Sequence, residues 1–217
     1  MILINRKLIE VKIALITLFV LLVLPIITFI VFADAGLSII GNALAQVNPA
    51  TKVVEIFNPD GEKIHELELS TAWPMTGIVT DEFGTMSELR YELNLGRHRG
   101  IDIANGFGLI GDPITPFSEG RVVTVDHSDD SACGISIRLD HGHNINSVYC
   151  HLSSIVVNID DSVEPGVIIG YSGNTGTSTG PHLHFGIEVY GVPVNPRVFL
   201  VGEPERMLPN AGAPITY

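Results

Sequence analysis

One uncharged apolar segment near the N-terminus constrains the fold of this chain more than any other feature. Of the 21 residues from Ile13 to Ala33, 18 are apolar and none is charged. A helix of about 20 apolar residues crosses the hydrocarbon core of a membrane, whereas the apolar region of a signal peptide has about 7–15 residues. We therefore predict a transmembrane helix over residues 13–33. A signal peptide that is cleaved after Ala33 or Ala45 is the main alternative, and a buried core helix is the second.

The charge of the chain divides at the same segment. Residues 1–12 contain three basic residues and one acidic residue, whereas from Asp34 onward nine basic residues stand against 23 acidic ones, a net charge of −14. Basic flanks stay in the cytoplasm, so we predict a single-pass cell-membrane protein with a cytoplasmic basic tail over residues 1–12. The remainder is then extracytoplasmic, or secreted or periplasmic if a signal peptide is cleaved. Binding to nucleic acid is excluded because it requires clustered Lys and Arg.

After residue 50, the chain consists of short runs of β-branched residues that Gly and Pro interrupt. No run of ten or more residues keeps an apolar period of 3.6 there. This pattern predicts an all-β fold with many short strands. Two runs, at residues 51–57 and 62–69, stand on either side of an Asn-Pro-Asp-Gly turn and predict a hairpin. We divide the chain after the apolar segment into a spacer with this hairpin over residues 34–72, a main domain over 73–200 and a C-terminal tail over 201–217.

The two cysteines, Cys133 and Cys150, flank a second predicted hairpin. Residues 135–139 and 145–149 alternate between apolar and polar, and residues 140–144 have the composition of a turn. Pairing about this turn brings the two cysteines almost opposite each other, where a disulfide can form in an oxidising compartment. A pair of buried free thiols is the alternative, and the sequence leaves both open.

Five polar residues have the composition of a catalytic zinc site. His98 and Asp102 share one face of an extended chain, with Gly100 leaving room between them, and His182 and His184 share one face of a predicted strand. His151 stands at the end of an apolar strand. Imidazole and carboxylate groups are good zinc ligands, and three of them with one open position define a catalytic site. The other four histidines lie in turns or among polar residues, and we interpret them as structural: His65, His127, His141 and His143.

The stretch from Trp73 to about Leu200 resembles the lysostaphin-type family of zinc metallo-endopeptidases, which cut the peptide cross-links of peptidoglycan. The motifs that carry the resemblance are Gly-Arg-His-Arg-Gly-Ile-Asp at 96–102, Tyr-Cys-His-Leu-Ser at 149–153 and Ser-Thr-Gly-Pro-His-Leu-His-Phe at 178–185. The resemblance implies a mostly antiparallel, sandwich-like β domain with its site in a groove. It also implies that His98, Asp102 and His184 bind one zinc ion per chain, and that His151 and His182 are catalytic residues that do not bind the metal.

Two positions depart from the family pattern without removing a predicted ligand. Cys150 stands where a small residue is common, and Gly186 stands where an acidic residue is frequent. We therefore expect a zinc-dependent endopeptidase that cleaves the peptide stems or cross-bridges of bacterial peptidoglycan, by attack of a metal-activated water that the two histidines assist. A non-catalytic module that binds peptidoglycan or a partner in a cell-wall machine is the alternative, and an exported peptidase for protein substrates is a third possibility. The bond that is cut and the division of roles between His151 and His182 stay open.

Overall fold

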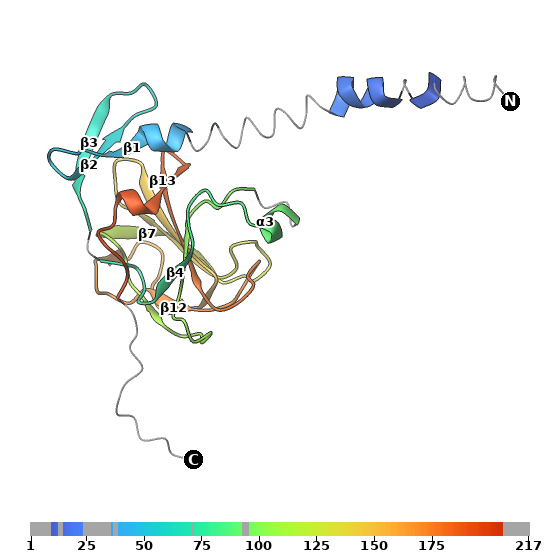
Figure 1. Ribbon diagram of the computed structural model, residues 1–217. Helices are drawn as coiled ribbons and strands as arrows, with labels where there is room; N and C mark the ends of the chain where they lie inside the picture. Colours follow the sequence, from blue (N-terminus) through green and yellow to red (C-terminus); the bar gives the residue numbers. More distant parts are fainter. Residues whose placement is uncertain are drawn as a thin grey trace, which may run out of the picture. The chain divides into compact units, whose positions relative to one another are not determined.

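The computed structural model describes residues 10–12, 15–23, 36, 39–70, 72–92 and 96–205 (Figure 1). The chain forms two compact units, Met1–Ile39 and Ile40–Tyr217. In the first unit, α-helical residues 15–18 lead into the π-helix η1 (Phe19–Val23). Within the described residues, no helix is both long and apolar enough to cross a membrane. The predicted span over 13–33 lies partly outside the described residues and stays a prediction.

The centre of the second unit is an eight-stranded antiparallel sheet, with the strand order β11-β7-β8-β9-β13-β5-β4 and with β14 paired to β13. Strand β13 shows why these sequences form strands: its apolar side chains Leu183, Phe185, Ile187 and Val189 are fully buried, while the alternate positions His184 and Glu188 are not. The bounds are β4 (Ile78–Asp81), β5 (Ile101–Ala104), β7 (Gly120–Asp126), β8 (Ser136–Asp140), β9 (Ile145–Cys150), β11 (Ser162–Val163), β13 (Leu183–Val189) and β14 (Val192–Val194).

A second, three-stranded sheet continues directly from the first. Its order is β10-β12-β6, formed by β10 (Leu152–Ile155), β12 (Gly170–Ser172) and β6 (Pro113–Ile114). Only His151 separates the end of β9 from the start of β10. The two sheets, with their antiparallel pairing, confirm the prediction of an all-β, mostly antiparallel domain. The helix α3 (Glu88–Glu92) and the 3-10 helix η2 (Pro196–Val198) also belong to this domain.

A third sheet, β1-β2-β3, lies at the opposite end of the domain from β12 (Figure 1). It contains β1 (Ala45–Val47), β2 (Val53–Phe57) and β3 (Lys63–Glu68), and β2 pairs with β3 antiparallel at the positions where the sequence predicts a hairpin. The residues before it differ from the expected spacer, because 39–44 are helical and Leu44 and Ala45 are buried in the main core. Ile39 and Ile40 of the same stretch stay exposed.

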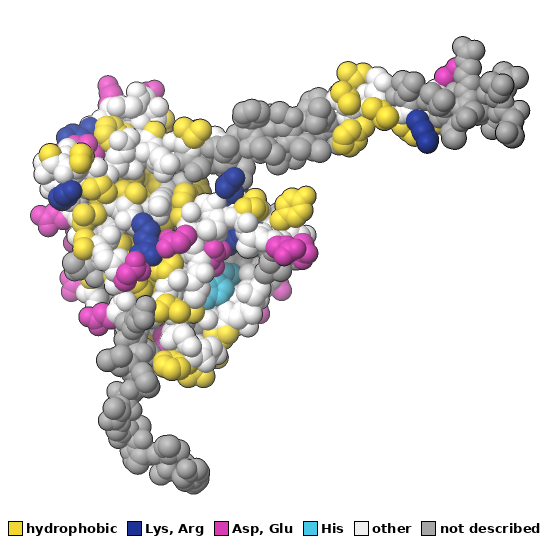
Figure 2. Space-filling view, viewed as in Figure 1, with side chains coloured by type: hydrophobic (Ala, Val, Ile, Leu, Met, Phe, Trp, Pro, Cys, Tyr) yellow, Lys and Arg dark blue, Asp and Glu magenta, His cyan; other side chains and the backbone are white. Residues whose placement is uncertain are grey.

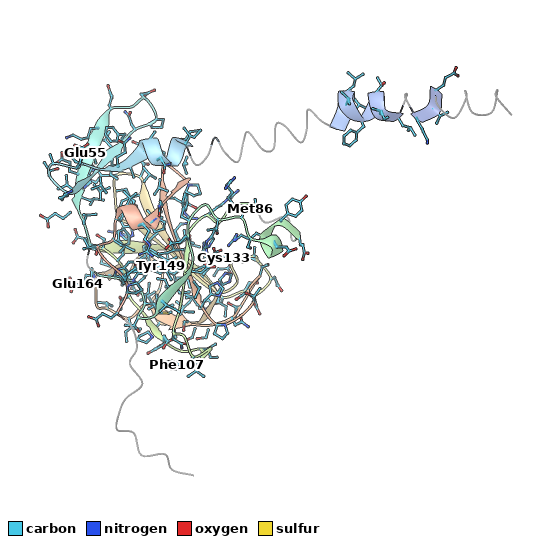
Figure 3. All side chains as sticks on the ribbon, in the orientation of Figure 1. Glu55, Met86, Phe107, Cys133, Tyr149 and Glu164 are labelled. Carbon is cyan, nitrogen blue, oxygen red and sulfur yellow. A yellow bond between two sulfur atoms is a disulfide. The ribbon has the colours of Figure 1, made fainter. Side chains whose placement is uncertain are left out.

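Cys133 and Cys150 form a disulfide, with their Cα atoms 5.0 Å apart. This confirms the disulfide and excludes the alternative of two free thiols. The hairpin of β8 and β9 that separates them pairs Ile137 with Tyr149, in agreement with the alternation of the sequence. Figure 3 labels Cys133 and Tyr149 in the body of the domain, where the hairpin lies.

Candidate metal centre and groove

One cross-strand row of the large sheet contains two of the three candidate metal ligands. Asp102 of β5 pairs in register with His184 of β13, and His184 pairs on its other side with Cys150 of β9. Side chains in one row of a sheet point to the same face, so Asp102 and His184 are neighbours there. His151 follows Cys150 directly. The pairing of three strands thus brings together residues that are up to 82 positions apart.

His98 completes a triangle of candidate ligands with Asp102 and His184. Its Nε2 atom lies 2.9 Å from Asp102 Oδ1 and 2.9 Å from His184 Nδ1, and His184 Nδ1 lies 2.9 Å from the same carboxylate oxygen. Burial alone would raise the pKa of Asp102, but the contacts of its carboxylate with His184 and His98 outweigh this and lower its pKa well below the usual range. Burial also lowers the pKa of His184. An ionised carboxylate and a neutral imidazole are the forms that bind a metal.

The surroundings of His98 and His184 fix the orientation of both rings. The Nδ1–H group of His98 donates to the carbonyl oxygen of Glu82 at 3.0 Å, and Asp81 Oδ2 lies 3.3 Å from the same nitrogen, so Nε2 faces the centre. The ring of His184 lies over Gly100, where an added Cβ would stand 2.8 Å from the ring and 2.4 Å from the carbonyl oxygen of Phe185. A glycine is therefore required at position 100. The two imidazoles and the carboxylate converge as a zinc site with three protein ligands requires.

The rings of His151 and His182 lie next to each other and beside this triangle of candidate ligands. Their ring centroids are 4.7 Å apart, and His182 Nε2 is 3.6 Å from Asp102 Oδ2. The Nδ1–H group of His151 donates to the carbonyl oxygen of Thr175 at 2.8 Å, and that of His182 donates to Gly180 at 2.8 Å. His151 has a φ of 64°. This left-handed conformation is rare outside glycine and turns the chain sharply between β9 and β10.

The environment of His151 keeps its ring neutral. Burial and the neighbouring His182 lower the pKa of His151 to about 4, although the Thr175 carbonyl opposes that shift. Because Nδ1 carries the proton that is donated to Thr175, the lone pair is on Nε2. A neutral imidazole with this tautomer can accept a proton from a water molecule.

Three of the five residues line a groove, whereas His98 is buried behind it. A recess of about 450 Å³ is lined by Asp102, His151 and His182 together with Thr80 and the Gly-rich segment 176–180. Histidine atoms reach the surface on the face that carries α3 (Figure 2). All five residues that the sequence singles out thus meet at one place, while His65, His127, His141 and His143 are not part of it.

The structure adds contributors that the sequence analysis missed, namely Asp81, Arg90 and the carbonyl groups of Glu82, Thr175 and Gly180. Carbonyl groups leave no signal in a sequence, but Ser87 before Glu88 is a helix-capping signal that would have found α3, which carries Arg90.

Comparison with known proteins agrees with this arrangement. The family model of peptidase family M23 matches residues 96–196. The peptidoglycan DD-endopeptidase ShyA of Vibrio cholerae is 40% identical over 98 residues, which cover 45% of this chain and 22% of ShyA. The glycyl-glycine endopeptidase ALE-1 of Staphylococcus capitis is 38% identical over 94 residues, which cover 43% of this chain and 25% of ALE-1. The chain thus spans about a quarter or less of the length of these curated relatives.

Two solved structures have a similar fold. A zinc-containing peptidase from Vibrio cholerae superposes with a TM-score of 0.52 at 25% identity, over 72% of this chain and 48% of that protein. A chain of the SpoIIQ–SpoIIIAH pore-forming complex superposes with a TM-score of 0.52 at 26% identity, over 61% of this chain and 91% of that one. By fold, motifs and sequence similarity, the domain that residues 96–196 form belongs to peptidase family M23, the lysostaphin-type family.

Proposed function

We propose that the protein is a zinc-dependent endopeptidase that cleaves peptide stems or cross-bridges of bacterial peptidoglycan. The observation that carries this proposal is the convergence of His98, Asp102 and His184, whose ligand atoms lie within 4.8 Å of one another. Two nitrogen donors and one carboxylate oxygen suit zinc, and one ion per chain is the expected content. The names of the relatives support a cell-wall substrate, because they include a peptidoglycan DD-endopeptidase and a glycyl-glycine endopeptidase.

The residues around the ligands would assist hydrolysis in two ways. When bound, zinc supplies Lewis-acid polarisation of the scissile carbonyl and activation of the attacking water. The Nε2 atom of His151 can accept the proton of that water, because its Nδ1–H is committed to Thr175. His182 donates its Nδ1–H to the carbonyl oxygen of Gly180, so its Nε2 atom is the second candidate for this role. Either ring, once protonated at Nε2, can donate a hydrogen bond to the oxyanion that forms during the attack or a proton to the leaving amine.

Substitution of His184 tests the proposal. His184→Ala removes one of three ligands, and we expect loss of stoichiometric zinc and a fall of at least 100-fold in the release of peptide fragments from purified cell walls. His127→Ala is the matched control, because His127 is exposed and lies outside the groove. Metal content by mass spectrometry and wall hydrolysis with and without a zinc chelator are the two measurements. Hydrolysis by His184→Ala at the rate of the control would overturn the proposal.

A non-catalytic role is the second candidate, because a chain of similar fold comes from the SpoIIQ–SpoIIIAH complex, which is named as pore-forming and not as a peptidase. A module of this kind would hold peptidoglycan or a partner protein in the same groove without turnover. Zinc bound at one ion per chain with no fragments released from walls of any cross-link type would favour this role. Release of fragments that stops on chelation and returns with added zinc would exclude it.

We also propose that residues 13–33 anchor the protein in the cell membrane, with the acidic domain on the extracytoplasmic side. The support is the length of the apolar segment and the basic residues before it. Intact-mass analysis of the protein in fractionated cells tests this. A full-length N-terminus in the membrane fraction is the expected result, whereas a mature chain that begins at Asp34 or Gln46 in a soluble fraction would identify a cleaved signal peptide.

A further inference from the structure

A second recess, of about 490 Å³, adjoins the groove. His151 and His184 form part of its wall. Arg90, His151 and Thr177 line both recesses, so the two are continuous past the candidate catalytic histidines. A peptide that lies along the groove with its scissile bond at the metal centre would place an adjacent residue in this second recess.

The second recess is strongly basic in an otherwise acidic domain. Arg90, Arg97 and Arg99 line it, and no Asp or Glu is among its described lining residues. From Asp34 onward the chain has only nine basic residues against 23 acidic ones, so a third of its positive charges meet at this one place. The same face of the molecule carries cationic side chains and the exposed histidine atoms (Figure 2). This concentration of charge makes the recess complementary to an anion.

Two of the three arginines contact other parts of the chain, whereas the third is available to bind a ligand. The Nε atom of Arg90 lies 3.4 Å from Asp81 Oδ2, and Arg97 Nη1 donates to the carbonyl oxygen of Gly84 at 3.0 Å. Both arginines are thus tied to the segment before His98. Arg99 is exposed and forms no ion pair or hydrogen bond with any described residue. Its planar guanidinium group remains available to bind a carboxylate through two parallel hydrogen bonds.

We infer that this second recess is a subsite for a carboxylate group on the residue next to the scissile bond, with Arg99 as its main contact. The inference rests on the proposed peptidase function and narrows its substrate class. Peptides that carry a free carboxylate beside the bond that is cut are then preferred over uncharged chains such as a glycine bridge. Arg90 and Arg97, which are held by Asp81 and by the carbonyl oxygen of Gly84, add positive charge beside Arg99. This added charge favours an anion there, since a single exposed ion pair contributes little.

A matched pair of peptides tests the subsite. Two synthetic cross-linked peptides differ only in a free carboxylate or a primary amide on the residue next to the scissile bond. We expect the full-length, zinc-loaded protein to cleave the acid form with a kcat/KM at least about tenfold higher. In Arg99→Gln we expect this ratio to fall to near one, because cleavage of the acid form slows. Arg99→Lys retains part of the preference, and the control Arg121→Gln, on β7, retains all of it.

Binding measurements separate failure of the subsite from failure of the proposed function. Fluorescence anisotropy with the same two peptides, labelled and mixed with metal-free protein, is expected to give tighter binding of the acid form and loss of the difference in Arg99→Gln. If both peptides are cleaved equally by the wild type, or if the preference survives in Arg99→Gln, the subsite is wrong and the peptidase function stands. If neither peptide is cleaved but the acid form still binds more tightly through Arg99, the subsite stands and the peptidase function is contradicted. Equal binding without cleavage contradicts both.

Discussion

At the scale of single residues, backbone carbonyl groups decide which nitrogen of each ring faces the groove. His98, His151 and His182 each donate Nδ1–H to a carbonyl oxygen, at Glu82, Thr175 and Gly180 respectively, and each therefore presents Nε2 to the site. His184 is different, because its Nδ1 atom faces Asp102. The tautomers are thus set by loops rather than by the side chains themselves. The loop with residues 173–180 contributes two of these carbonyls, so its conformation controls both candidate catalytic rings.

A histidine outside the site is expected to make the fold sensitive to acid. His141 donates Nδ1–H to the carbonyl oxygen of Glu119 and accepts at Nε2 from the Ser147 hydroxyl, at 2.6 and 2.7 Å. Burial lowers the pKa of His141 from its ordinary value of 6.5, although the Glu119 carbonyl and Asp140 oppose the shift. The unfolded chain therefore binds a proton that the folded chain excludes, and the free energy of unfolding falls as the pH drops below about 6.5, by at most about 1.4 kcal/mol per unit.

Urea unfolding between pH 5 and 7.5 measures this effect. We expect the wild type to lose stability toward pH 5 more steeply than His141→Gln, which cannot take up the proton. The comparison between the two proteins removes the contribution of the other titrating groups. The same slope in both proteins would show that His141 does not couple folding to pH.

At the scale of elements, strand register assembles the site. The row that contains Asp102, His184 and Cys150 crosses three strands, and a shift of one residue in any pairing would turn a ligand to the opposite face. The disulfide fixes the end of this row. The backbone N–H of His151 donates to the carbonyl oxygen of Cys133 at 2.9 Å, so both the bond and the loop before β8 hold His151 in its left-handed conformation.

Removal of the disulfide is therefore expected to affect both stability and turnover. The bond closes a loop between residues 17 positions apart. In Cys133→Ser/Cys150→Ser, we expect the free energy of unfolding to fall by about 3 kcal/mol. Wall hydrolysis should fall by about tenfold or more because His151 is less well positioned, with zinc content retained. Chemical reduction of the wild type should reproduce the loss of activity. Unchanged hydrolysis in the double variant would show that the bond does not position His151.

At the scale of the whole molecule, the N-terminal sheet is part of the main core. Val54 and Ile56 of β2 are fully buried and belong to the same apolar cluster as Leu44 and the strands of the large sheet. The backbone of Gly41 also approaches Pro193 so closely that an added Cβ would stand 2.4 Å from its carbonyl oxygen. The unit that packs together therefore begins well before Trp73, the predicted start of the main domain.

Two truncated chains test where the folding unit begins. A chain that starts at residue 40 should unfold at the same temperature as the full chain. A chain that starts at residue 73 exposes the apolar surface that β1–β3 cover. We expect it to lose about 3 kcal/mol or more, a fall of about 6–12 °C in Tm. Calorimetry of both proteins is the measurement, and equal transitions would show that β1–β3 contribute nothing to the stability of the domain.

Local patterns in the sequence were sufficient to predict some features and not others. Alternation of apolar and polar residues predicted the strands around residues 135–149, because burial of one face of a strand has a period of two. The apolar period did not predict helix α3, because its five residues are too few for a helical period to appear. The part of the expected spacer that precedes the hairpin includes strand β1 and the buried side chains of Leu44 and Ala45, because packing against a distant segment compensates for a weak local pattern.

By itself, the sequence determined the chemical composition of the candidate site, the class of the fold and the family, because residue types, periods of two and motif spacing are all local properties of the chain. Only the tertiary structure decided that Asp102, His184 and Cys150 share one row, that three carbonyl groups fix the ring nitrogens, and that Arg90, Arg97 and Arg99 line one recess beside them. These relations depend on strand register and on the paths of loops. Both are set by packing between segments that are far apart in the chain, and no local pattern encodes them.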